Sequence, residues 1–375
     1  MLEIVLDEPK NVYAPSQNVS GRVKVTIYDN PKKVKSLDFC CKGEAHTSWD
    51  RYEGKCNVKR ENRWIIPYEG REEYFRIEKN LIGGKGSLVE LQPGEHVYPF
   101  SCTLPAAAPS SFEGTKGFVR YTVKATLVRP WKLNYHARKI IKVVRPLDLN
   151  VISRLREPAS VVMNKSFCCL WCKSGPLNVT LSLPYTGYTP GQSITATCEI
   201  DNGSDVDVEE IVFTLKQLVF YHSTNPWKES WATENRIAVK SHVQRIAART
   251  RERFDETLIV PDVPPSHLTY CAIIDLDYLF HVMVKLSPFH TDMSSAIPLT
   301  IGSVPLEGTL LPFMNNSLSE FQPIQSECTS DSSILVSDNE KQSTKLSPTY
   351  YELNGTPQIV SNEEDVKAVL LPKVN

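Results

Sequence analysis

The chain has 375 residues, of which 41% are hydrophobic and 23% charged, so it is long enough for two or three domains and apolar enough to bury ordinary cores. Its formal net charge of -1 hides an uneven distribution, with 25 Lys and Arg against 17 Asp and Glu in residues 1–150, and 4 against 10 in residues 305–375. A basic first part favours acidic partners such as phosphorylated segments, anionic lipid headgroups or nucleic acid, and the alternative is an ordinary solvated surface.

The opening segment, MLEIVLDEPK, has no basic lead and no long apolar core, which argues against a secretory signal. No stretch approaches the roughly 18–20 apolar residues that span a bilayer. We therefore expect a soluble, intracellular protein whose cysteines are mostly reduced.

In chain order, the predicted elements are strands, rich in β-branched and aromatic residues and separated by Pro, Gly, Asn and Asp. The clearest are NVSGRVKVTIY (18–28), VKSLDFCCKGEA (34–45), FVRYTVKATLV (118–128), KIIKVVRPLDL (139–149) and EIVFTLKQLVFYH (210–222). No long window shows the sustained apolar period of a helix, so the sequence predicts an all-β fold with turns at the spacing of β-sandwiches.

Two stretches align without a gap, YAPSQNVSGRVKV (13–25) and YTPGQSITATCEI (188–200). Three residue types recur at matching positions: Tyr13 with Tyr188, Pro15 with Pro190, and Gln17 with Gln192. Three further elements follow in the same order: VKSLDF and VEEIVF, LPAAAPSS and VPDVPPSH, and final strands around Tyr121 and Tyr278. In the proline-rich element this alignment pairs Pro109 with Pro265 and Ser110 with Ser266. The four matches predict one unit used twice.

We therefore predict two immunoglobulin-like β-sandwich domains in tandem, over residues 1–149 and 150–305, the second beginning with a linker at 150–173. The first unit is longer, and its additional residues are expected as loop between Asp50 and Pro93. Residues 306–375 are acidic, rich in Ser, Thr and Asn, and lack alternating patterns, which predicts a disordered C-terminal tail.

Three stretches resemble the arrestin domain-containing proteins, or α-arrestins: SSFEGTKGFVRYTVKATLVRPW (110–131), SFCCLWCKSGPLNVTLSLPYTGYTPGQSI (166–194) and IPLTIGSVPL (297–306). The resemblance runs over about residues 3–306 and implies the arrestin fold, two β-sandwiches joined in tandem. It also implies an adaptor, not an enzyme, that binds membrane receptors or transporters as cargo and links them to endocytosis, endosomal sorting or ubiquitination. The implied location is cytoplasmic and peripheral at the plasma membrane and endosomes, with no cofactor and no nucleic-acid partner.

Many α-arrestins recruit a Nedd4-class ubiquitin ligase through Pro-Pro-x-Tyr motifs, whose prolines hold a polyproline II turn for a WW domain. This sequence has no such motif, and the nearest candidate in the tail, formed by Ser347, Pro348 and Tyr350, lacks the first proline. Tyr350 and Leu353 also fit Tyr-x-x-Φ (Φ is a bulky apolar residue), which clathrin adaptor subunits bind as an added strand. These four residues are the predicted partner-binding site of the tail.

Cys168, Cys169 and Cys172 form the cluster CCLWC. Their apolar neighbours favour either a buried, reduced edge or a surface loop open to palmitoylation. A zinc site would need four ligands, and Cys198 and Cys271 can contribute only if the fold brings them close. We predict no metal site, and lipidation is the functional alternative to burial.

The sequence shows no catalytic constellation: it has no phosphate-binding loop, no Gly-x-Ser-x-Gly and no paired histidines at helical spacing. Asp275 and Asp277 share one face of a predicted strand, an arrangement that is more often solvated than catalytic. We therefore predict that the protein is not an enzyme. A different function, implied by the thioredoxin-interacting branch of the same family, is sequestration of a soluble partner through a reactive cysteine.

Six basic residues crowd the first strands and turns. On an arrestin fold they could receive acidic or phosphorylated cargo segments through charge-assisted hydrogen bonds. They are Lys10, Arg22, Lys24, Lys32, Lys33 and Lys35. The alternative is that they are ordinary surface residues.

Overall fold

The computed structural model describes residues 1–309 except 54–63, 85, 87, 168–174 and 289. The described part consists of strands with two short 3-10 helices, η1 (Leu149–Val151) and η2 (Ser153–Arg156), which confirms the all-β prediction. Within it, no helix is long and apolar enough to cross a membrane.

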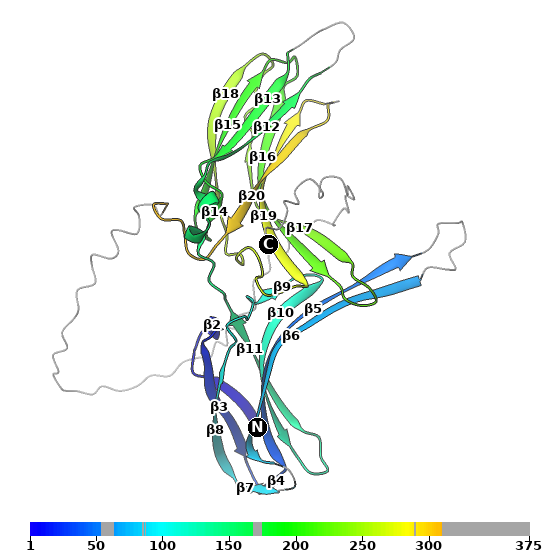
Figure 1. The fold of residues 1–375 in the computed structure, drawn as a ribbon, viewed down its shortest axis with the longest axis vertical. Coiled ribbons are helices and arrows are strands. Elements are labelled where there is room, and N and C mark those ends of the chain that lie inside the picture. The colour runs from blue at the N-terminus through cyan, green and yellow to red at the C-terminus, as the bar shows by residue number, and fades with distance from the viewer. Residues whose placement is uncertain (54–63, 85, 87, 168–174, 289, 310–375) are drawn as a thin grey trace, which may run out of the picture. The chain divides into compact units, whose positions relative to one another are not determined.

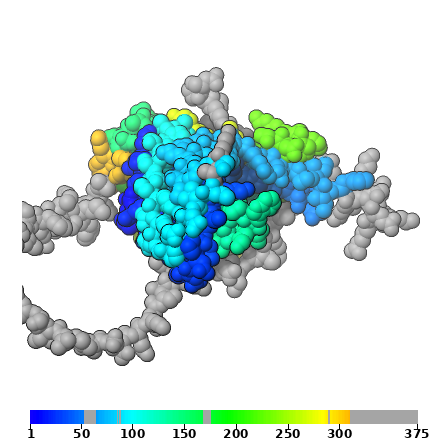
Figure 2. Space-filling model, turned by 90° about the horizontal axis from the view of Figure 1, so that it is seen from below, coloured from blue at the N-terminus to red at the C-terminus, as the bar shows by residue number. Residues whose placement is uncertain are grey.

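The first sandwich packs a three-stranded sheet against a larger one (Figure 1). The smaller sheet contains, in order, β1 (Leu2–Leu6), β3 (Asn18–Ile27) and β8 (Gly94–Thr103). The larger sheet has the order β2 (Val12–Tyr13), β11 (Tyr135–Val143), β10 (Gly117–Val128), β5 (Ser36–Glu53) and β6 (Trp64–Gly83), with β9 (Phe112–Glu113) beside β10. A small pair, β4 (Lys32–Val34) and β7 (Val89–Leu91), lies at one end, which Figure 2 shows face on.

The second sandwich repeats this plan. One sheet has the order β12 (Ala159–Lys165), β13 (Leu177–Leu183), β15 (Ser193–Asn202) and β18 (Arg251–Ile259). The other has the order β14 (Gly187–Tyr188), β20 (Met293–Ile301), β19 (Ile274–Leu286), β16 (Val208–His222) and β17 (Ser230–His242). The prediction of two tandem β-sandwiches is therefore confirmed.

Alternation on β3 and β15 builds the core in the way that the repeated sequence predicts. Val19, Val23 and Val25 point inward from β3, and Ile194 and Ile200 do so from β15; all are at most 2% exposed. Burying each such side chain contributes about 1.5–3 kcal/mol, which favours this register over a slip of one residue.

The turn before each of these strands is held by one glutamine. Gln17 Oε1 accepts the amide of Ala14 at 2.8 Å, and Gln192 Oε1 accepts the amide of Thr189 at 2.8 Å. The short strands before these turns, β2 and β14, pair in parallel with the last strand of their own sandwich, β11 and β20. The shared Tyr-x-Pro-x-Gln pattern therefore has one structural role in both halves.

A buried tyrosine fixes the proline-rich turn in each half. Tyr121 donates its hydroxyl to the carbonyl of Pro109 at 2.7 Å, and Tyr278 donates to the carbonyl of Pro264 at 2.7 Å. Pro109 is thus equivalent to Pro264.

The predicted pairing of Pro109 with Pro265, and of Ser110 with Ser266, is therefore wrong by one residue. The amides of Ser111 and Ser266 bond the equivalent carbonyls of Val143 and Ile301, each at 2.7 Å, which gives the correct pair. The turn of the first half has one more residue, and an alignment by residue type alone does not detect it.

The stretch 150–173, predicted to be a linker, contains a strand of the second sandwich. β12 pairs antiparallel with β13 from Ala159 opposite Leu183 to Lys165 opposite Leu177. It is an edge strand with mixed exposure, including Val162 at 65%, so its sequence carries only a weak apolar alternation. The domain boundaries at 149 and 305 stay predictions.

The region from Asp50 to Pro93, predicted to hold loop, contains the end of β5 and all of β6 and β7, and the part of the predicted loop at 54–63 lies outside the described residues. β5 and β6 form a long two-stranded ribbon whose pairing continues to Glu53 opposite Trp64. β5 alternates buried and outward residues as far as Trp49, whereas β6 has mixed exposure along its length, so a strand pattern is hard to recognise in β6.

The two buried tyrosines give a test of the repeat. We expect Tyr121→Phe to lower the free energy of unfolding by about 1 kcal/mol, because one buried hydrogen bond is lost. Tyr278→Phe should lower the free energy of unfolding by about 1–2 kcal/mol. The loss is larger because the side-chain amide of Gln217 donates to the tyrosine oxygen at 3.0 Å and would lose this acceptor as well. Urea denaturation followed by circular dichroism measures both. Tyr135→Phe, at a half-exposed position, is the control, and an equal loss there would contradict this assignment.

Candidate functional site

The structure places four of the six predicted basic residues at the two ends of β3. Lys10 precedes β2, near the start of β3, whereas Lys32, Lys33 and Lys35 follow the far end of β3, on or beside β4. The ten residues of β3 extend over roughly 30 Å, so the two groups cannot contact one phosphate.

Two of the six residues lie between these ends and already have acidic partners. Lys24 Nζ is 3.3 Å from a carboxylate oxygen of Glu95, and Arg22 lies 3.9 Å from Asp7. Within the described residues, Lys32, Lys33 and Lys35 are exposed and have no such partner. The six residues therefore do not form a single anion-binding site.

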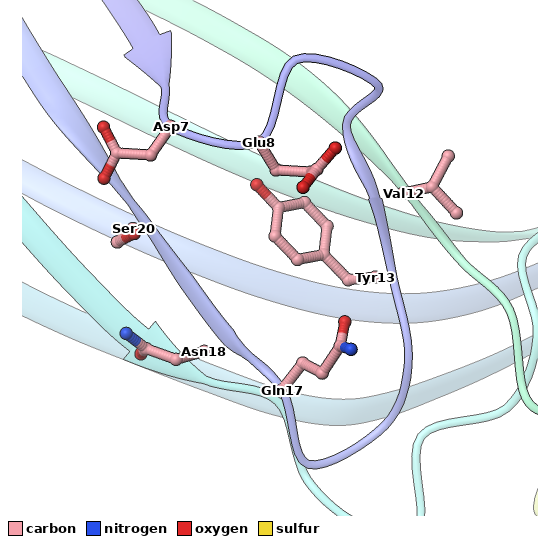
Figure 3. A pocket seen from close by; sticks show the side chains of 7 residues that line it. All are labelled: Asp7, Glu8, Val12, Tyr13, Gln17, Asn18 and Ser20. Carbon is pink, nitrogen blue, oxygen red and sulfur yellow. The ribbon is translucent and has the colours of Figure 1, made fainter. Parts of the chain in front are cut away.

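The pocket beside Lys10 has acidic walls. It has a volume of about 380 Å³ and is lined by Asp7, Glu8, Val12, Tyr13, Gln17, Asn18 and Ser20 (Figure 3). Burial, with Glu8 and Asp7 nearby, raises the pKa of Tyr13, so its hydroxyl stays protonated. Such a lining favours hydrogen-bond donors or cations over phosphate.

The tyrosine of this pocket is a feature of the fold. The hydroxyls of Tyr13 and of its repeat counterpart Tyr188 are both buried without a hydrogen-bond partner in the described part of the chain. Since the same feature recurs in both halves, it does not indicate a ligand of the first half alone.

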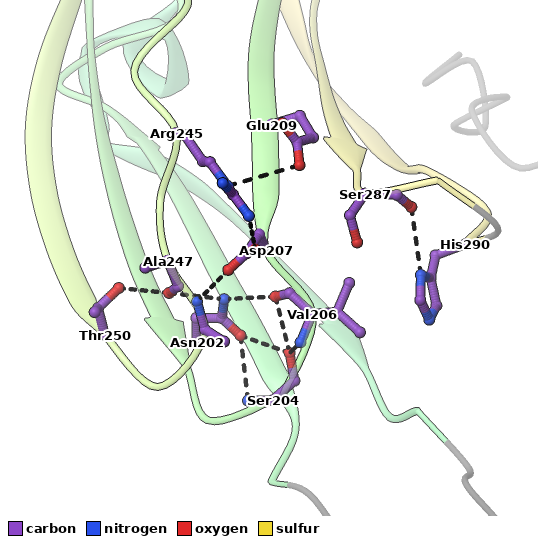
Figure 4. A network of polar contacts seen from close by, with 11 residues as sticks. Asn202, Ser204, Val206, Asp207, Glu209, Arg245, Ala247, Thr250, Ser287 and His290 are labelled. Atoms are coloured by element: carbon purple, nitrogen blue, oxygen red, sulfur yellow. Dashed lines mark hydrogen bonds and ion pairs between the residues drawn. The ribbon is translucent and has the colours of Figure 1, made fainter.

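A second polar cluster, at the turn after β15, is structural (Figure 4). Asn202 Nδ2 donates to the carbonyls of Val206 and Ala247, and Asn202 Oδ1 accepts the hydroxyl of Ser204 at 2.6 Å. Asp207 accepts the amide of Ala248 and the guanidinium of Arg245, which together lower the pKa of its carboxyl. Each donor here has an acceptor, so the cluster fixes the turn.

Several predicted site residues lie outside the described residues. They are Ser347, Pro348, Tyr350 and Leu353 of the tail, and Cys168, Cys169 and Cys172 of the cysteine cluster. Their roles stay predictions.

The described cysteines do not form a metal site. Cys198 is buried in the core of the second sandwich, whereas Cys271 lies in a loop before β19. Among the described residues, the three-residue group with metal-ligand spacing is His267, Asp275 and Asp277. His267 pairs with Asp277 at 3.2 Å, and this contact raises the pKa of the imidazole. The ion pair between His267 and Asp277 therefore accounts for this grouping without a bound metal ion.

The contact between the two sandwiches was not predicted from the sequence. The ribbon of β5 and β6 meets the turn that joins β16 to β17. Glu69 donates its amide to the carbonyl of Asn225 at 2.8 Å, and its carbonyl accepts the amides of Thr224 and Asn225, each at 2.9 Å. The hydroxyl of Thr47 donates to the carbonyl of His222 at 2.8 Å. We call this set of contacts the seam.

Aromatic rings surround the seam. Trp49 and Tyr68 stack with centroids 5.7 Å apart on the first sandwich. Trp227 of the second sandwich meets Tyr68 edge-on at 5.6 Å, and Trp231 meets Trp49 at 6.3 Å. Such pairs contribute about 0.5–1.5 kcal/mol each beyond the area they bury. In the sequence, the contact could have been suspected only from these four aromatic residues. The fold is needed to show that they meet.

Further along the ribbon, an acidic side chain extends the seam. The carboxylate of Glu72 accepts the amide of Ala272, with both oxygens at 3.2 Å. The neighbouring Cys271 contacts Tyr74, and burial raises the pKa of Cys271 to about 11. This thiol therefore stays protonated near neutral pH.

The seam can be tested at Thr47, which is fully buried. Thr47→Val keeps the side-chain shape but removes the hydroxyl, so we expect it to lower the free energy of unfolding by about 1–2 kcal/mol. Hydrogen exchange should also become faster at the amides of Thr224 and Asn225, which both bond Glu69. Thr47→Ser keeps the hydroxyl and should retain most of the protection. Unchanged exchange in the valine variant would show that the seam does not depend on this bond.

The comparisons with known proteins identify the two sandwiches. Residues 2–150 match the family "Arrestin (or S-antigen), N-terminal domain", and residues 173–306 match "Arrestin (or S-antigen), C-terminal domain".

Relatives cover most of the chain. "Arrestin domain-containing protein 17" of Caenorhabditis elegans is 30% identical over 82% of this chain and 72% of its own length. "Arrestin domain-containing protein 1" of Homo sapiens is 28% identical over 81% of this chain and 64% of its own length. "Arrestin domain-containing protein 4" of Homo sapiens is 27% identical over 80% and 71%, so the chain spans about two thirds of these relatives.

Proteins of this family are adaptors that bind other proteins and are not enzymes. The chain belongs to the arrestin family, among the arrestin domain-containing proteins, or α-arrestins.

Proposed function

We propose that the protein is a cytoplasmic adaptor that holds a membrane receptor or transporter with its sandwiches and recruits sorting machinery with residues 347–353. It acts at the plasma membrane and endosomes as a peripheral protein. The observation that carries this proposal is the family match over both sandwiches, together with the seam that joins them. A pair of sandwiches offers a broad surface for cargo without any chemistry of its own.

The recruiting segment has two uses that share Tyr350. With Ser347 and Pro348, it forms a degenerate WW-domain ligand for a Nedd4-class ubiquitin ligase. With Leu353, it forms a Tyr-x-x-Φ ligand for a clathrin adaptor subunit. Both routes lead to removal of cargo from the plasma membrane, and they differ in the residues that they need.

Sequestration of a soluble partner through a reactive cysteine is the weaker alternative. A reactive thiol needs exposure and a lowered pKa. Burial raises the pKa of Cys198 to about 12, and burial also raises those of Cys40 and Cys271. The pKa of Cys102 is lowered by a hydrogen bond from Cys41, but Cys102 is buried. In the described part of the chain, no thiol combines both properties.

A role in binding anions, either a phosphorylated cargo segment or anionic lipid headgroups, is best supported at one end of β3. Arg22 and Lys24 have acidic partners, and Lys10 lies beside an acidic pocket. Lys32, Lys33 and Lys35 retain uncompensated charge. We restrict the proposed anion-binding role to these three residues.

The tail can be tested with the full chain and two separate partners, isolated Nedd4-class WW domains and the peptide-binding subunit of a clathrin adaptor. We expect Tyr350→Ala to weaken both interactions at least about tenfold, because the tyrosine anchors both peptides. Leu353→Ala should weaken only adaptor binding. Fluorescence anisotropy or calorimetry measures each affinity.

Tyr351→Ala is the matched control, because it removes a neighbouring ring that neither motif uses. A chain that binds neither partner would contradict recruitment through this segment. An effect of Tyr351→Ala as large as that of Tyr350→Ala would contradict the assignment of the tyrosine.

A further inference from the structure

One end of the first sandwich exposes several large apolar side chains. Trp131 is fully exposed, and Leu133 is 87% exposed, both in the turn between β10 and β11. Tyr28, directly after β3, is 69% exposed, and Leu88, directly before β7, is 59% exposed. Monomeric proteins seldom gather such side chains unless the surface binds something.

These segments lie side by side at the end that carries β4 and β7. The amide of Lys35 bonds the carbonyl of Val128, the last residue of β10, at 2.8 Å. β4 pairs with β7, with Val34 opposite Val89. Figure 2 looks onto this end and shows the blue segment after β3, the cyan segment around β7 and the blue-green hairpin of β10 and β11 together. We call this surface the β4–β7 end.

The hairpin turn has a fixed conformation that holds its apolar tip away from the sandwich. Arg129 Nε donates to the carbonyl of Leu133 at 2.8 Å, and the guanidinium lies 3.8 Å from the ring centre of Tyr135. The amide of Arg129 also bonds Asn134 Oδ1 at 3.2 Å. Trp131 adopts a positive φ of 54° within this turn. A preorganised turn loses little conformational entropy when its tip is buried against another surface.

Basic residues lie at the same end of the sandwich as the apolar tip. Lys32, Lys33 and Lys35 lie on or beside β4, and Lys132 lies in the hairpin turn between the two exposed apolar residues. In the part of the chain that the structure describes, these four lysines have no ion-pair partner, unlike Arg22 and Lys24 further along β3. The nearby acids, Asp29 and Glu90, are fewer, so this end has a net positive charge.

We propose that the β4–β7 end docks on an anionic lipid surface, with Trp131 and Leu133 in the headgroup boundary and the lysines on the lipid phosphates. Interfacial binding increases with buried apolar area and with attraction to anionic lipids, and this end supplies both. A phosphorylated peptide would use the lysines but would leave the tip in water, so lipid fits the observations better. The inference rests on the proposed function, since a membrane adaptor works beside such a surface.

The test measures sedimentation of the full chain with vesicles of phosphatidylcholine alone or mixed with phosphatidylserine. We expect binding to the mixed vesicles, weakened at high salt. Trp131→Ala with Leu133→Ala should reduce partitioning about tenfold or more, while Trp131→Phe retains most of it. Lys32→Glu with Lys33→Glu should reduce it at least as much, because each cation near the surface contributes about fivefold.

Two control pairs lie on the second sandwich. Val162→Ala with Val243→Ala removes exposed apolar groups, and Lys228→Glu with Lys240→Glu makes the same charge change at exposed lysines. Both pairs should bind vesicles like the unaltered chain. All the altered side chains are exposed, so melting temperatures should not change.

Three outcomes would overturn the proposal. They are equal binding to neutral vesicles, full binding by the variant that lacks Trp131 and Leu133, and binding of a phosphorylated peptide through Lys32 and Lys33 with no vesicle binding. Because the vesicles contain no protein, failure of the recruiting tail leaves this result unaffected. The tail assay, in turn, contains no lipid, so the two proposals can fail separately.

Discussion

The two sandwiches approach closely at Gly70, and the arrangement of the seam depends on this contact. A β-carbon on Gly70 would lie 2.5 Å from the carbonyl oxygen of His222 and 2.5 Å from the hydroxyl of Thr47. These are the two atoms that bond each other across the seam. Only glycine at this position lets the β5–β6 ribbon come close enough for Glu69 to pair with Asn225. The aromatic contacts around it follow from that distance.

The seam shows how one repeated unit gains two different roles. Both halves keep the same glutamine-held turn and the same buried tyrosine, so their cores are equivalent. They differ in their long hairpins, β5 with β6 and β16 with β17, whose facing surfaces carry Trp49 and Tyr68 on one side and Trp227 and Trp231 on the other. The repeat therefore supplies two stable scaffolds, and the divergent hairpins supply the contact that makes them one unit.

The sequence predicted those parts of the fold in which one face of a strand is buried. β3 and β15 alternate cleanly because each pleat places every second residue in a core. β12 and β6 were missed because β12 is an edge strand with the apolar Val162 on its exposed face, and β6 has mixed exposure along its length. The offset at Pro109 was missed because residue types alone do not show which carbonyl the tyrosine bonds.

Closeness in sequence was a poor guide to the site, because β-strands carry neighbouring residues far apart. Lys10 and Lys32 bracket β3, and its extended backbone places them at opposite ends of the sandwich. Conversely, Lys35 and Val128 are separated by more than ninety residues in the sequence. They are neighbours in the fold, because the amide of Lys35 donates a hydrogen bond to the carbonyl of Val128. Surface chemistry on a sandwich is organised by its ends, where the turns of different strands meet.

The two ends of the first sandwich consequently differ in chemistry. At the β2 end, Asp7 and Glu8 line a polar pocket with a protonated tyrosine, and Asp7 also pairs with Arg22. At the β4–β7 end, exposed Trp131 lies among uncompensated lysines. An anionic bilayer would attract the second end and repel the first, so the charge distribution along β3 would orient the sandwich with its strands directed toward the membrane. Such an orientation would leave the faces of the sheets accessible to a protein partner.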